Sequence, residues 1–170
     1  MPKLIDTTAA LRENPWHLLP KDSTLEQAQE TASNHIIVPL ALWLAQKPVL
    51  QSGGKQVGVW LDSNEQVGAL AEDLDSLALV ALNFPGFMDG RAYSGAVTLR
   101  QRYGFQGEIR AIGDVLRDQL FYMKRCGFST FDLSDSVQLA DAIRAMQDFS
   151  DSYQSTVECP APLFARRQAS

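Results

Sequence analysis

The segment "GEIRAIGDVLRDQLFYMKRCGFSTFDL", residues 107–133, has the pattern of a strand, a helix and a second strand, with few residues left over for the connections. A β-rich run at 109–112 precedes a helix for which Asp114 is the predicted N-cap and Gly127 the terminator. The buried stripe of this helix is formed by Leu116, Leu120 and Met123. "FSTFDL" then alternates as a strand does. Because one helix joins the two strands, we expect them to pair in parallel.

The same plan extends in both directions along the chain. Upstream, the apolar run at 76–84 predicts a buried strand, and the helix after it should end at Gly104. Before that, a β-rich run at 57–61 precedes Asp62 and Glu65, a capping-box pair. The helix predicted there buries Val67, Leu70 and Leu74. Downstream, Ser134 or Ser136 caps a helix marked by Leu139, Ile143, Met146 and Phe149.

About four consecutive βα units predict an α/β domain with a parallel sheet. The pattern fits an open doubly wound sheet and also a half-barrel, half of a (β/α)8 barrel. We assign residues 51–153 to this α/β core. Residues 1–50 are expected to be an N-terminal addition to the same domain, with a short strand in "NPWHLLPKD" and helices in "STLEQAQETA" and "VPLALWLAQ". Residues 154–170 are expected to form a C-terminal tail on the surface or on a partner.

Composition limits the function classes. The chain has 170 residues, a formal net charge of -5 and a pI near 4.9, which argues against a nucleic-acid binder. Two cysteines, Cys126 and Cys159, and two unpaired histidines give no metal-ligand spacing. With no signal peptide and no run long enough to span a bilayer, we expect a cytoplasmic protein without membrane contact. The composition permits a homodimer but does not require one.

The loop "NFPGFMDGRAYSGA", residues 83–96, supplies the candidate binding site. It should lie at the carboxyl ends of the strands, where ligands of parallel sheets collect. The predicted ligand-binding residues are Asp89, Gly90, Arg91, Tyr93, Ser94, Asp114 and Arg117. Arg91 and Arg117 would hold a small oxyanion or an acidic partner patch, oriented by acidic neighbours. The alternative is a packed corner in which Arg91 is braced by Asp89 or Asp114.

The charge pattern fits a small anion but identifies no reaction. Residues 83–126 carry seven basic and four acidic side chains, a locally positive segment in an acidic protein. Arg100 and Arg102, in the last turn of their helix, are expected on a solvated face. The sequence has no GxGxxG after a strand, no GxxxxGK[ST] and no GxSxG, so no cofactor is evident and no catalytic residue can be named.

Three blocks carry a family resemblance: DGRAYS (89–94), GEIRAIGDVLRDQL (107–120) and CGF (126–128). They resemble the domain of unknown function 934 family, whose bacterial members usually bear the label "probable oxidoreductase involved in sulfite reduction". Members are typically encoded beside the haemoprotein sulfite reductase, so the resemblance implies that reductase as a partner. It implies an accessory protein of assimilatory sulfite reduction, binding an oxyanion or the reductase. The alternatives are an oxidoreductase with a borrowed cofactor or redox partner, and a structural subunit docking through the tail at 160–167.

Overall fold

The computed structural model describes residues 3–86 and 88–147. Within these residues the strands form one seven-stranded sheet in the order β1-β7-β6-β5-β4-β3-β2. Their bounds are β1 (Leu4–Asp6), β2 (Trp16–Leu18), β3 (His35–Pro39), β4 (Gln56–Leu61), β5 (Leu79–Phe84), β6 (Glu108–Gly113) and β7 (Thr130–Asp132). The sheet curls into a half-barrel, which confirms the predicted α/β class and selects the half-barrel over the doubly wound alternative.

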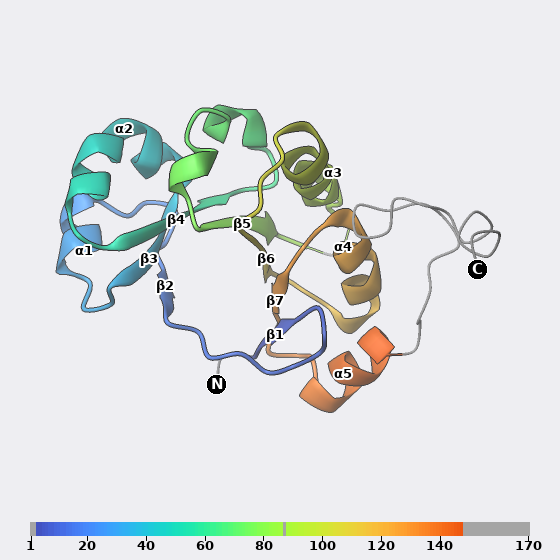
Figure 1. Cartoon of the computed structure of the whole chain (residues 1–170). Coiled ribbons are helices and arrows are strands. Elements are labelled where there is room, and N and C mark those ends of the chain that lie inside the picture. The colour runs from blue at the N-terminus through green and yellow to red at the C-terminus, as the bar shows by residue number, and fades with distance from the viewer. Residues whose placement is uncertain (1–2, 87, 148–170) are drawn as a thin grey trace.

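The strand order explains the curl. From β2 to β7 each strand pairs in parallel with the next one along the chain, and in the described residues this order never reverses. Right-handed crossovers that all advance in one direction place their helices on one face of the sheet. Figure 1 shows the helices along the outer, convex side, while the chain between β1 and β2 runs across the open side. The α-helices of the described residues are α1 (Leu25–Glu30), α2 (Leu40–Ser52), α3 (Arg91–Val97), α4 (Leu120–Cys126) and α5 (Leu139–Gln147).

Residues 16–52 belong to the repeat, whereas the first fifty residues were expected to be an addition to it. β2 pairs in parallel with β3, and β3 with β4, so residues 16–52 add two βα units. The prediction failed at "HIIVP", residues 35–39, which is a strand buried from Ile36 onward. Its last residue, Pro39, is the N-cap of α2, and the helix signal of "VPLALWLAQ" hid the strand before it.

β1 has the opposite direction to its neighbour. It pairs antiparallel with β7, with Ile5 opposite Phe131, and caps that edge of the sheet. Thus the strand nearest the N-terminus lies beside the last strand of the repeat.

Apolar side chains fill both faces of the sheet. The larger core lies between the sheet and the helices and includes Val59, Val80 and Ile109, each fully buried. The concave face holds a smaller cluster of Ile37, Trp60, Leu79, Ala81 and Ile112, with Trp16 packed against it. The indole N–H of Trp60 donates to the carbonyl of Leu19 at 2.9 Å. The interior of the half-barrel is therefore a packed core rather than a channel.

One predicted helix is replaced by two short turns. Val67, Leu70 and Leu74 are buried as expected, but they lie in two 3₁₀ helices, η1 (Val67–Leu70) and η2 (Leu74–Ser76). Between them the buried Asp73 accepts hydrogen bonds from the indole of Trp43 at 2.8 Å and from Lys47. These hydrogen bonds fix the segment between the two turns against α2.

The longest helix, α2, has 13 residues and contains Pro48. Across the described part of the chain, no helix combines the length and apolar character needed to cross a membrane.

Candidate functional site

The carboxyl ends of β4 and β5 are joined by side-chain hydrogen bonds. Asp62, directly after β4, accepts from Lys21 Nζ at 2.6 Å and from Asn83 Nδ2 at 3.1 Å. The hydrogen bond from Lys21 is the main cause that lowers the pKa of Asp62. Lys21 was missing from the predicted site because it follows β2, which was not recognised as part of the parallel sheet.

Arg91 opens α3 and is held by Asp89. Its Nε donates to Asp89 Oδ1 at 2.9 Å and its Nη2 to Asp89 Oδ2 at 2.5 Å, while Nη2 also donates to Ser63 Oγ at 3.0 Å. Hydrogen bonds from Arg91 and Ser63 hold the pKa of Asp89 well below its usual range. The brace between Arg91 and Asp89, expected as the packed-corner alternative, is thus present. No partner is placed at Arg91 Nη1 among the described residues, and the side chain is 62% exposed.

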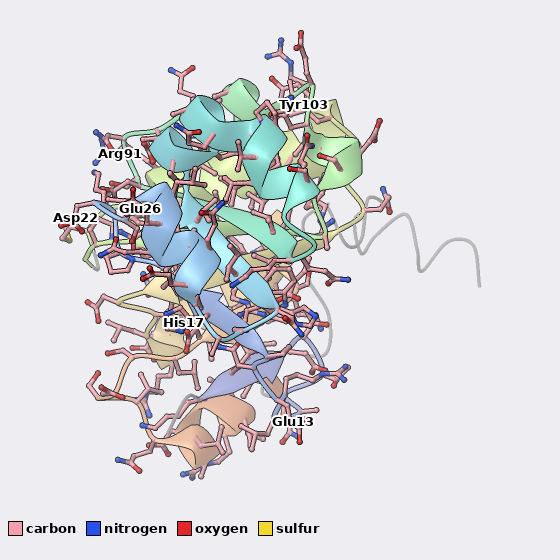
Figure 2. The ribbon with its side chains drawn as sticks, turned by 90° about the vertical axis from the view of Figure 1, so that its left-hand side faces the viewer. Glu13, His17, Asp22, Glu26, Arg91 and Tyr103 are labelled. Carbon is pink, nitrogen blue, oxygen red and sulfur yellow. The ribbon has the colours of Figure 1, made fainter. Side chains whose placement is uncertain are left out.

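A groove of about 410 Å³ runs beside α3, between this helix and the segment after β4. Arg91 lies at the start of α3, and Arg102 ends the π-helical segment η3 (Thr98–Arg102) that continues the helix. Hydroxyl groups line the space between these two guanidinium groups, from Ser63, Ser94, Thr98 and Tyr103. In Figure 2, Arg91 and Tyr103 lie on opposite sides of the view, in keeping with a groove that follows the length of the helix.

The predicted residues of the 89–94 loop divide between two faces of α3. Gly90 is the N-cap, and Ser94 faces the groove with Arg91. Tyr93 lies outside the residues that line the groove, and its ring packs at 5.0 Å from Phe84 and at 4.8 Å from Tyr122. Burial raises the pKa of Tyr93, so its hydroxyl stays protonated at neutral pH.

Asp114 and Arg117 also lie outside the residues that line this groove. Asp114 is not the N-cap of α4, because the chain first forms the short helix η4 (Arg117–Gln119) and α4 begins at Leu120. The sharp turn at Gly113, with φ +91°, places the Asp114 amide against the carbonyl of Phe84 at 2.7 Å. Arg117 pairs with Asp118 at 3.2 Å, and both side chains are mostly exposed.

Arg100 corrects the expectation of a solvated face. Its guanidinium is half-buried and hydrogen-bonded to the loops that precede β6 and β7. Arg102 is exposed, as expected, and lies over the ring of Tyr103 at 5.6 Å.

The thiol of Cys126 is 5% exposed, and burial raises its pKa, so it is a packing residue with little thiolate character. In the part of the chain that the structure describes, no three His, Cys, Asp or Glu side chains gather as metal ligands would.

Comparison with known proteins gives one family. A family model described as "Bacterial protein of unknown function (DUF934)" matches residues 58–164, which is more than half of the chain. The match begins within β4 and includes both the loop that carries Arg91 and the groove-lining helix α3. A search of curated proteins finds no match.

Proposed function

This chain belongs to the DUF934 family of bacterial proteins, and we propose that it is an accessory protein of assimilatory sulfite reduction that binds a small oxyanion beside α3. The pathway part of the proposal rests on the label that family members carry. The observation that supports the anion part is the geometry of Arg91, whose fork is fixed by Asp89 while its Nη1 edge has no partner among the described residues.

A fixed guanidinium is a suitable anion ligand because little side-chain freedom is lost when the ligand binds. The ion pair with Asp89 offsets part of the positive charge of Arg91. The other positive charge of the groove lies at its far end, on Arg102. Glu65, the acidic residue of the lining, accepts from the backbone amide of Asp62 at 2.7 Å and is held toward that loop. The hydroxyl of Ser94 supplies a neutral donor that sulfite or sulfate can use.

A second candidate role, docking to the sulfite reductase haemoprotein, is favoured by an exposed residue in the same loop. Met88 is 91% exposed and directly precedes Asp89. An exposed, flexible thioether is the kind of side chain that adapts to a protein surface. In this role the oxyanion site and the partner surface share one loop.

Calorimetric titration of the purified protein with sulfite, sulfate, phosphate and NADPH, at matched ionic strength, tests the proposal. Replacing Arg91 with alanine removes one charge-assisted contact and should weaken sulfite binding about tenfold. Arg117→Ala is the matched control, since it removes a guanidinium that follows a neighbouring strand but lies outside the groove. Wild-type affinity in Arg91→Ala would contradict the groove as the binding site, and equal losses in both variants would point to a site shared by the two loops.

The same samples separate the other functions. Binding of NADPH alone, or a visible absorbance band, would favour the oxidoreductase. Co-elution with the reductase haemoprotein, without binding of any anion, would favour the docking role.

A further inference from the structure

The groove beside α3 has an arginine at each end. Four side chains of the segment formed by α3 and η3 line it, at spacings of three, four and four residues: Arg91, Ser94, Thr98 and Arg102. Side chains at such spacings share one face of a helix. At about 1.5 Å per residue, the segment from 91 to 102 extends at most roughly 16 Å along its axis. The two guanidinium groups therefore mark the two ends of one elongated space.

The wall between the two arginines is polar and uncharged. It carries the hydroxyl groups of Ser94, Thr98 and Tyr103, to which the structure gives no hydrogen-bond partner among the described residues. Asn64 and Gln66 add two amide groups from the segment after β4. Hydroxyl and amide groups both donate and accept hydrogen bonds, so this wall suits a ligand with polar atoms in its middle section.

Arg102 is a cation without a carboxylate beside it. The described residues give its guanidinium neither an ion pair nor a hydrogen bond, and it lies over the ring of Tyr103 at 5.6 Å. Gly68 leaves room for that tyrosine, because a Cβ at this position would lie 3.2 Å from the Tyr103 hydroxyl. A contact with the face of a ring uses none of the five N–H donors of a guanidinium. Arg102 therefore keeps its donors for solvent or a ligand.

The acidic groups near the groove are engaged at the end opposite Arg102. Asp89 accepts from Nε and Nη2 of Arg91. Glu65 accepts from the backbone amide of Asp62 at 2.7 Å. Neither acid forms an ion pair with Arg102 in the part of the chain that the structure describes. The positive charge at the Arg102 end is therefore not offset by a direct ion pair with these residues.

We propose that the ligand of this groove is an elongated molecule with an oxyanion group at each end, one bound by Arg91 and the other by Arg102. Its volume of about 410 Å³ lies in the range of roughly 300–1,000 Å³ that is typical of small-molecule sites, and sulfite or phosphate alone would leave much of it empty. A molecule already held at one end binds at the other without a second loss of translational freedom. This ligand class rests on the proposed function, because the oxyanion on Arg91 is one of the two ends.

The test is a calorimetric titration of the full-length protein, at matched ionic strength, with methyl phosphate and with alkanediol bisphosphates of increasing spacer length. We expect one spacer length at which the bisphosphate binds at least about tenfold more tightly than methyl phosphate, which has a single end group. Arg102→Ala should remove this gain, and Arg102→Lys, which keeps the charge, should keep most of it. Arg91→Ala should weaken both kinds of ligand, by about tenfold. Arg117→Ala, outside the groove, is the matched control.

The outcomes separate the elongated ligand from the oxyanion site itself. Binding of methyl phosphate with no gain from a second phosphate at any spacer length would overturn the elongated ligand and leave the Arg91 site intact. Absence of binding by every ligand would overturn both. A gain that survives in Arg102→Ala, or that falls equally in Arg102→Ala and Arg117→Ala, would also overturn the elongated ligand, because its second group would not lie on Arg102. Tighter binding of glucitol 1,6-bisphosphate than of hexane-1,6-diol bisphosphate would support a polar middle section, and weaker binding would overturn that part.

Discussion

Replacing Arg100 with methionine should destabilise the fold far more than the same change at Arg102, two residues along the same segment. Methionine keeps much of the apolar stem but leaves three carbonyls and one hydroxyl without their donor. A buried acceptor that loses its partner costs about 1–3 kcal/mol. Because a cavity lined by Arg100, Gly127 and Ser129 admits water to some of these groups, we expect a total loss of about 3 kcal/mol. Arg102 is exposed, so its replacement should change stability by less than about 0.5 kcal/mol.

Urea unfolding of both variants, with the m-value as a check that the unfolded states are comparable, measures this difference. For a chain of this length, each kcal/mol lowers the thermal midpoint by roughly 2–4 °C, so Arg100→Met should melt roughly 6–12 °C below the wild type. If the two variants unfold within about 0.5 kcal/mol of each other, the connection between the loops does not depend on Arg100 and the reasoning is refuted.

Gly113→Ala should lower the unfolding free energy by about 2–4 kcal/mol, because φ is +91° and the new Cβ would lie 2.4 Å from a side-chain oxygen of β5. Gly54→Ala, at φ +73° in open space, should cost only about 1 kcal/mol, and similar losses in urea unfolding would refute the steric argument. Burial alone would raise the pKa of Asp6, but hydrogen bonds from a threonine, two backbone amides and an arginine lower it from 3.8 to about 2. This carboxylate therefore stabilises the fold fully above about pH 4 and loses that contribution between pH 4 and pH 2. The acid-unfolding profile of the asparagine variant should lack this part, and an unchanged profile would contradict it. In a Cys159→Ser variant, Cys126 should react with an aromatic disulfide reagent orders of magnitude more slowly in the folded than in the unfolded protein, while rapid reaction of the folded protein would show that its burial is transient.

The βα units after residue 56 could be predicted because each carries its own local signals. The apolar runs of β5 and β6 are short and continuous, and Gly104 and Gly127 have the positive φ expected of helix terminators. β1 and β3 lacked such signals. β1 has three residues and exists only through pairing with β7, and β3 leads straight into a proline that marks a helix start. Pairing between distant segments leaves no periodicity in a single sequence.

The same rule holds for the candidate site: contacts between residues close in sequence could be predicted, and contacts between distant residues could not. The brace between Asp89 and Arg91 joins residues two apart, so it could be expected from the loop alone. The acceptors of Arg100 include groups 27 and 29 residues further on, and no local pattern relates them. Asp114 has the residue type and the position expected of an N-cap. However, Gly113 lies so close to β5 that the turn there is fixed, and α4 begins only at Leu120.

The pairing of β1 with β7 also sets an order of assembly during synthesis. Strands β3 to β7 each pair with the strand made just before them, so the sheet can grow as the chain emerges. β1 is made first, but its partner appears only when residues 130–132 are complete. Until then Leu4 and Ile5, both buried in the folded protein, lack the β7 residues with which they pair. The N-terminal strand can therefore take its place in the sheet only after β7 has been made, when α5 is the one described helix still to follow.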